Sequence, residues 1–203
     1  MKLNLYACLY FIQTRSSDES AHYKPSKTGE AYLYVEKSSV VGVGNVDTGF
    51  GLYTYAKIPK NVFVCAYAPT ATLRTSRQEG DYAMELTIAG ERISVNGQEN
   101  AFEIGLGIFC NDGSFPFSLL PEKFSRLVSE RINCEFAKRD NEVWIKSTRE
   151  IKPKEELLVC YSSDGSYWKS LFSTNQLEMI KEALRQCGPS LSDAENAISL
   201  LTV

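Results

Sequence analysis

The chain carries two segments, Asn133-Cys134-Glu135-Phe136 and Glu155-Glu156-Leu157-Leu158-Val159-Cys160-Tyr161, on either side of an alternating stretch. In that stretch Val143 and Ile145 lie two residues apart, as the buried side chains of a strand do. Leu157 to Tyr161 predicts one further short strand, which follows an acidic pair and ends in a tyrosine. The order of strand, turn, acidic pair and tyrosine is the most specific pattern in the sequence.

The length and composition of the chain indicate one globular domain with small appendages. Its 203 residues suffice to bury a core, and an apolar fraction of 43% with a charged fraction of 23% is ordinary for a globular protein. The net charge of −3 argues against a large non-specific nucleic-acid surface and is compatible with a basic peptide as partner.

The six cysteines form no Cys-x-x-Cys pair: Cys8, Cys65, Cys110, Cys134, Cys160 and Cys187. The single histidine is His22, so neither a metal site nor a cysteine-based hydrolase is supported. Several cysteines lie in apolar runs, which predicts buried, reduced thiols in an intracellular compartment. The stretch Leu3 to Ile12 is shorter than the about 20 residues of a membrane helix and lacks a signal-cleavage pattern. It predicts a first strand, with a polar loop after it over residues 15–30.

Short strands are expected over most of the chain. Val62 to Tyr67 predicts a buried strand, and Tyr82 to Ile88 alternates between apolar and smaller or polar residues. A turn at Ala89-Gly90-Glu91-Arg92 and a return strand with Ile93 and Val95 complete a predicted hairpin.

Helices are expected late in the chain. One begins at Pro121, a second at Ser173-Thr174, and a third at Ser192 with Glu195 placed for a capping box. The elements together predict a mainly β, α+β fold with a helical insertion and a helical C-terminal tail.

Gly49-Phe50-Gly51-Leu52 is the first motif that suggests a ligand, because glycine lets a backbone approach one closely. A plain turn between strands explains the motif as well, and Gly42-Val43-Gly44 is a competing match. Tyr67 ends a predicted strand just before Pro69, and a half-buried strand tyrosine is its alternative role. Asn111 offers a donor and an acceptor for the polar end of a cofactor, whereas a simple Asn-Asp-Gly turn is the alternative.

In this order, across residues 49–161, the motifs resemble the SET-domain protein-lysine methyltransferases, as a divergent member without the zinc-binding tail of many relatives. The resemblance implies a β-clip of small sheets with a threaded C-terminal segment. It also implies methyl transfer from S-adenosylmethionine, which becomes S-adenosylhomocysteine, to the amine of a lysine in a protein, with a histone tail as substrate. Pro69 and Asp112 depart from the family's usual glycine and histidine.

The resemblance further implies roles for individual residues. Tyr161 and Tyr67 are the expected catalytic residues, and a phenylalanine at Phe136 favours di- or trimethylation. Tyr167 or Trp168 is expected either to cover the adenine or to anchor the tail. The expected cofactor-binding residues are Gly49, Phe50, Gly51, Leu52, Asn111, Asp112, Tyr161 and Trp168. The expected substrate channel is lined by Tyr67, Tyr82, Phe136 and Tyr161.

The predicted organisation has three parts: an N-terminal strand and polar loop over 1–30, a SET domain over 31–168 with an insertion at 113–132, and a helical tail over 169–203. The insertion is expected to rest over the threaded loop or to shape a substrate groove. The family implies a nuclear location, whereas the net charge and the short apolar stretch predict no direct nucleic-acid binding and no membrane. A catalytically degenerate module that acts as a binding or regulatory scaffold is the alternative; Pro69 and Asp112 favour it, whereas Tyr161 and Asn111 favour activity.

Overall fold

The structure, a computed structural model, describes residues 33–43, 49–67, 83–88, 91–96, 106–139, 142–162 and 165–201. The predicted strand at Leu3 to Ile12, the polar loop over 15–30, and the residues Pro69 and Tyr82 lie outside these ranges.

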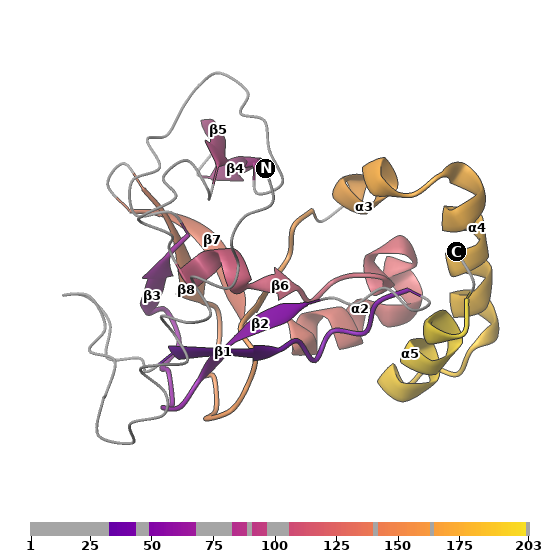
Figure 1. The fold of residues 1–203 in the computed structure, drawn as a ribbon, viewed down its shortest axis with the longest axis horizontal. Helices are drawn as coiled ribbons and strands as arrows, with labels where there is room; N and C mark the ends of the chain where they lie inside the picture. Colours follow the sequence, from indigo (N-terminus) through magenta and orange to yellow (C-terminus); the bar gives the residue numbers. More distant parts are fainter. Residues whose placement is uncertain are drawn as a thin grey trace.

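Within the described residues the strands form four small sheets (Figure 1). Two are antiparallel pairs, one is a three-stranded sheet in the order β3-β8-β7, and the last is the parallel pair β6-β9. The strands are β1 (Leu33–Lys37), β2 (Phe50–Thr54), β3 (Phe63–Ala66), β4 (Ala83–Ile88), β5 (Glu91–Asn96), β6 (Asn111–Asp112), β7 (Cys134–Arg139), β8 (Glu142–Ser147) and β9 (Leu158–Val159). The described strands therefore form short ladders, and two of these ladders, β3-β8 and β6-β9, join strands that are distant in sequence.

The predicted hairpin is confirmed with a shorter turn. β4 and β5 pair antiparallel, and Ile88 lies opposite Glu91. Glu91 and Arg92 thus belong to β5, so the prediction that they form part of the turn was wrong. The ladder thus runs from the pair Ala83 and Asn96 to the last residue of β4 and the first of β5. β9 is also shorter than predicted, since only Leu158 and Val159 pair with β6.

The helical elements in the described residues are the 3-10 turns η1 (Leu106–Phe109) and η2 (Phe117–Leu119) and the helices α2 (Pro121–Arg131), α3 (Ser166–Leu171), α4 (Thr174–Gln186) and α5 (Leu191–Ser199). α2 begins with the predicted proline, whose missing N–H is not needed in the first turn. Ser173 and Gln176 form a capping box on α4. The predicted start of α5 at Ser192 is wrong, because Ser190 is its cap and accepts from the N–H of Asp193.

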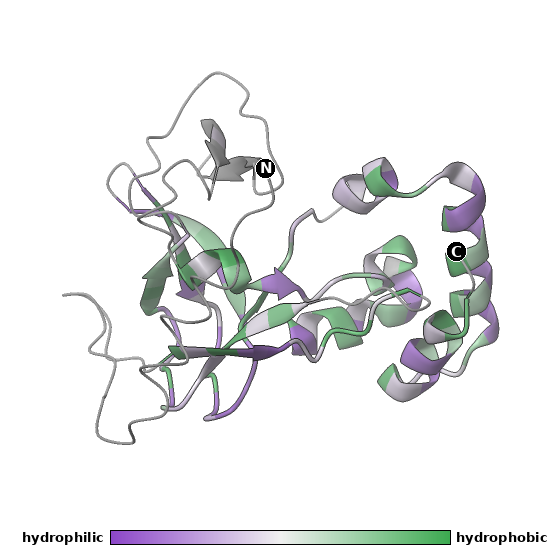
Figure 2. Ribbon diagram, viewed as in Figure 1, coloured by the Kyte–Doolittle hydropathy of each residue, from purple (hydrophilic) through white to green (hydrophobic). Residues whose placement is uncertain are grey.

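The buried side chains of the described residues form two hydrophobic cores. The strand core includes Leu52, Ile58, Ile145, Leu157 and Val159, which are essentially inaccessible to solvent. The helical core joins the insertion to the tail and includes Phe117, Phe124, Ile180, Leu184 and Ile198. Figure 1 shows α3, α4 and α5 on the side of the molecule where α2 lies, away from β3 and β8. In Figure 2 α4 and α5 are purple and green in turn, as amphipathic helices are.

The predicted insertion therefore packs on the tail. Lys123 of α2 donates its ammonium to the carbonyls of Leu184, Arg185 and Cys187, at 2.7, 3.0 and 2.7 Å. These carbonyls lie at the C-terminal end of α4. The last carbonyls of a helix have no partner within the helix, and the helix dipole favours a cation there. The predicted border between residues 168 and 169 falls inside α3, so the last turn of the predicted domain and the start of the tail are one helix.

The cysteines in the described residues are free thiols, and three of them, Cys65, Cys110 and Cys134, are buried. Burial raises the pKa of the Cys65 thiol to about 12, which keeps it protonated and unreactive. No group of three or more His, Cys, Asp or Glu side chains in the described part of the chain is arranged to hold a metal ion. None of the described helices combines the length and apolar composition needed to span a membrane.

Candidate active site

Asn133 holds the threaded segment in place. Its side chain is completely buried, its Oδ1 accepts from the N–H of Leu158 at 2.8 Å, and its Nδ2 donates to the carbonyl of Glu156 at 2.7 Å. Its backbone N–H donates to the carbonyl of Leu158 at 3.1 Å. The side-chain amide of Asn133 thus binds the segment that leads into β9 as a neighbouring strand would. It gives partners to the N–H of Leu158 and the carbonyl of Glu156, which would otherwise be buried without a hydrogen bond.

Tyr161 follows β9, and its hydroxyl donates to the carbonyl of Cys110 at 2.9 Å. Cys110 directly precedes β6, which is the parallel partner of β9. Burial, followed by the neighbouring Tyr67 and Asp112, raises the pKa of the Tyr161 phenol well above its usual value. The hydroxyl therefore stays protonated at neutral pH and acts as a hydrogen-bond donor.

Three of the predicted channel residues lie together. The rings of Tyr67 and Phe136 meet edge to face with centroids 5.5 Å apart, and those of Phe136 and Tyr161 are 6.5 Å apart. A residue that the sequence analysis missed helps to place Tyr67: a Cβ at Gly107 would lie 2.7 Å from its Cα. Only glycine allows η1 to approach β3 so closely. The fourth predicted channel residue, Tyr82, lies outside the described residues.

The two predicted cofactor motifs meet at β2 and β6. Asn111 donates from its side-chain nitrogen to the carbonyl of Phe50 at 3.0 Å. Gly49 has a φ of +72°, and a Cβ there would have nothing within 4 Å, so this backbone has an open side. Gly49 thus combines a conformation that favours glycine with room for a ligand. Leu52 contributes its side chain to the strand core instead.

Glu156 is a member of the site that the sequence analysis did not single out. Its buried carboxylate accepts from the hydroxyl of Ser38 at 2.8 Å, the N–H of Ser39 at 2.7 Å and the hydroxyl of Tyr53 at 3.1 Å. Asn111 also donates to it, at 3.1 Å. Burial and then the Glu156 charge raise the pKa of Tyr53 to about 12. The available signal was the acidic pair itself, since its second member lies next to a strand that is otherwise apolar.

Asp112 and Trp168 bind each other. Asp112 is buried, its Oδ1 accepts from the N–H and the hydroxyl of Ser114 at 2.8 and 2.6 Å, and its Oδ2 accepts from the indole N–H of Trp168. Burial raises the pKa of the Asp112 carboxyl, although these hydrogen bonds work in the opposite direction. The Trp168 ring stacks on Phe115 with centroids 4.0 Å apart. Trp168 therefore makes the contacts of a tail anchor, while Tyr167 lies against Tyr161 with centroids 5.2 Å apart.

Comparison with known proteins identifies the same region. The family model of the SET domain matches residues 49–162, more than half of the chain, and this range includes Gly49, Asn111, Asn133 and Tyr161. No curated protein matches the sequence.

Two solved human structures are similar to this chain. The methyltransferase domain of PR domain-containing protein 2 is 14% identical with a TM-score of 0.41, over 64% of this chain and 76% of that one. The methyltransferase domain of histone-lysine N-methyltransferase SETMAR is 20% identical with a TM-score of 0.42, over 66% of this chain and 46% of that one.

Proposed function

Because the chain belongs to the SET-domain family, we propose that it transfers a methyl group from S-adenosylmethionine to the side-chain amine of a lysine in a protein substrate. The family membership confirms the predicted resemblance and fold. The observation that carries the proposal is the meeting of two sides of one site: Tyr161 binds the carbonyl of Cys110, and the next residue, Asn111, binds the backbone of Phe50.

The cofactor side of the site carries a polar group of the kind that S-adenosylmethionine needs. Gly49 would leave room beside its Cα, and Asn111 would offer the carbonyl oxygen of its side chain. When bound, the cofactor supplies an electrophilic methyl group on a positively charged sulfur. The Tyr161 hydroxyl donates to the carbonyl of Cys110, the residue directly before Asn111. The phenol therefore lies next to the cofactor side of the site.

The substrate side suits a neutral amine. A free lysine amine has a pKa of about 10.4, so it has to lose a proton before it can attack a methyl group. The rings of Tyr67, Phe136 and Tyr161 would surround the amine with apolar surface, which disfavours the ammonium form. The Tyr161 hydroxyl would then orient the nitrogen, and positioning of the two reactants would be the main source of rate enhancement.

A histone tail in the nucleus is the proposed substrate. The net charge of −3 supports a basic peptide rather than nucleic acid as the partner. Phe136 lines the channel with a ring that lacks a hydroxyl, which favours di- or trimethylation over monomethylation.

The test is the transfer of tritiated methyl from S-adenosylmethionine to core histones and nuclear extract, with mass spectrometry to locate the modified lysine. Tyr161→Phe is expected to keep the fold and to lower turnover about a hundredfold, because the amine loses its orienting group. Wild-type turnover in this variant would remove the role assigned to the hydroxyl. Absence of transfer together with absence of cofactor binding by calorimetry would refute the enzyme proposal.

The second candidate is a module that has lost catalysis and acts as a scaffold. It is favoured by the hydrogen bonds of Asp112, whose two carboxylate oxygens already bind Ser114 and Trp168. This candidate predicts a folded protein that binds a basic peptide and transfers no methyl group, so the same calorimetry and transfer measurements separate the two.

A further inference from the structure

A buried carboxylate lies beside the glycine motif. Glu156 is 4% exposed, and its Oε1 would lie 2.0 Å from a Cβ added to Gly51. The second glycine of the motif therefore makes room for this side chain. A buried charge is unfavourable unless it is hydrogen-bonded. Both oxygens are satisfied: Oε1 accepts from Ser38 and Asn111, and Oε2 accepts from Ser39 and Tyr53.

These bonds determine which way the Asn111 amide points. Its nitrogen lies 2.9 Å from the hydroxyl oxygen of Ser38, 3.0 Å from the carbonyl of Phe50 and 3.1 Å from Glu156. Rotating the amide by half a turn would place its oxygen against a carboxylate and a carbonyl, which repel it. The side-chain oxygen of Asn111 meets no hydrogen-bond donor among the described residues.

We propose that Glu156 is a positioning residue that turns the Asn111 carbonyl oxygen toward the cofactor as a hydrogen-bond acceptor. The site then takes a ligand group that donates an N–H. This inference rests on the proposed function, because S-adenosylmethionine carries two such groups: the ammonium of its amino-acid end and the amine of its adenine.

Residues before the family match complete this arrangement. The Ser38 hydroxyl donates to Glu156 at 2.8 Å and accepts from Asn111 at 2.9 Å, so it joins the two side chains directly. Ser39 binds the other oxygen of the carboxylate with its N–H and its hydroxyl. Both serines follow β1 and precede residue 49, where the SET-domain match begins. Ser38 and Ser39 are thus part of the cofactor side of the site.

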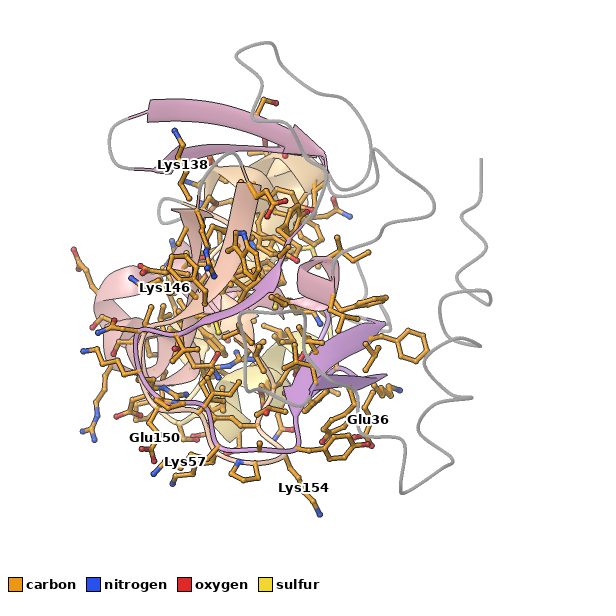
Figure 3. All side chains as sticks on the ribbon, turned by 90° about the vertical axis from the view of Figure 1, so that its left-hand side faces the viewer. Glu36, Lys57, Lys138, Lys146, Glu150 and Lys154 are labelled. Atoms are coloured by element: carbon orange, nitrogen blue, oxygen red, sulfur yellow. The ribbon has the colours of Figure 1, made fainter. Side chains whose placement is uncertain are left out.

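The experiment measures binding of S-adenosylhomocysteine to wild type and to Glu156→Gln by calorimetry. In the variant one terminal oxygen becomes an NH₂ group, which accepts no hydrogen bond, so the one remaining oxygen cannot accept from all of the donors that the carboxylate binds. The amide of Asn111 is then free to turn, and we expect the dissociation constant to rise about tenfold, the effect of one charge-assisted hydrogen bond. Glu150→Gln is the matched control: Glu150 is exposed and its carboxylate pairs with Lys57 at 2.8 Å (Figure 3).

Two ligand analogues separate positioning from a general loss of structure. 5′-Methylthioadenosine lacks the ammonium, and S-inosylhomocysteine lacks the adenine amine. If Asn111 accepts from the ammonium, wild type and Glu156→Gln should bind 5′-methylthioadenosine with equal affinity and should keep the tenfold difference for S-inosylhomocysteine. If Asn111 accepts from the adenine amine, the two analogues should give the opposite results. An equal loss of affinity for all three ligands, or no loss for any of them, overturns the inference.

Ser38→Ala gives a second test if Glu156→Gln does not fold. It removes one hydroxyl between Glu156 and Asn111, and we expect a rise in the dissociation constant of about fivefold for S-adenosylhomocysteine, with the same dependence on the analogues. A wild-type protein that binds no cofactor refutes the proposed function, and this inference with it. A wild-type protein that binds the cofactor, with variants that bind it equally well, refutes the inference alone.

Discussion

The strand core and the helical core hold the same chain together by different means. The strand core is accompanied by buried polar side chains. Asn133, Glu156 and Ser147 are almost or wholly inaccessible to solvent, and each is hydrogen-bonded. The helical core consists of aromatic and aliphatic side chains such as Phe117, Phe124 and Ile180. Hydrogen bonds are directional, whereas apolar contact is not. The strand core therefore specifies the path of the threaded segment, and the helical core mainly supplies stability.

The largest expected effect is on the helical core. Phe124→Ala removes a ring that is 1% exposed and lies 5.5 Å from Phe117, and we expect a loss of about 3–5 kcal/mol in the free energy of unfolding. Urea denaturation measures this loss. Leu171→Ala, at an exposed position of α3, is the control and should change stability by less than about 0.5 kcal/mol. The folded fraction of Phe124→Ala should bind S-adenosylhomocysteine as wild type does; a weaker affinity would contradict the division of roles between the cores.

Asn133→Ala tests the strand core in the same way. It leaves the N–H of Leu158 and the carbonyl of Glu156 buried without partners, and we expect a loss of about 3 kcal/mol in the free energy of unfolding. Unlike Phe124→Ala, it should also reduce methyl transfer by the folded protein, because the segment that ends in Tyr161 is no longer held. Asn196→Ala, on the exposed side of α5, is the matched control. Full turnover in Asn133→Ala would show that the hydrogen bonds of Asn133 to Leu158 and Glu156 serve stability alone.

Trp168→Phe tests the contact between the two cores. The ring can still stack on Phe115, but the hydrogen bond to the buried Asp112 is lost, and we expect about 1.5 kcal/mol less stability in thermal unfolding. Trp144→Phe is the control, because its indole donates to Glu142, a carboxylate that water still reaches. Equal losses for the two tryptophans would show that burial of Asp112 adds nothing to the bond.

The smallest expected effect is a dependence on pH. Burial alone would raise the pKa of the Glu155 carboxyl, but hydrogen bonds from Arg149, Lys152 and Asn133 lower it below its ordinary value of 4.5. A lowered pKa in the folded state means that Glu155 stabilises the protein above pH 4.5, and that this contribution is lost as the pH falls through the lowered pKa. Urea midpoints of wild type and Glu155→Gln should therefore differ at pH 7 and converge in acid. A constant difference across this range would contradict the assigned pKa.

Local sequence determined much of the fold. Pro121 and Ser173 mark helix starts through chemistry that lies within one helical turn, and the structure has both. The start of α5 was misplaced because Ser190 and Ser192 are both plausible caps, and only the backbone conformation distinguishes them. The glycine motif, Asn111 and Tyr161 were found because their spacing along the chain resembles that of a known family.

Only the tertiary structure decided how these parts are used. The sequence shows an acidic pair, but not that Glu156 lies beside Gly51 and binds serines more than a hundred residues earlier. Nor does it show that the insertion packs on the tail, where Lys123 donates to carbonyls at the C-terminal end of α4. Burial and hydrogen bonding between distant segments depend on how the chain folds back on itself, which no local pattern records. The sequence alone determined the kinds of elements and the family; long-range packing decided which polar groups are buried and which way they point.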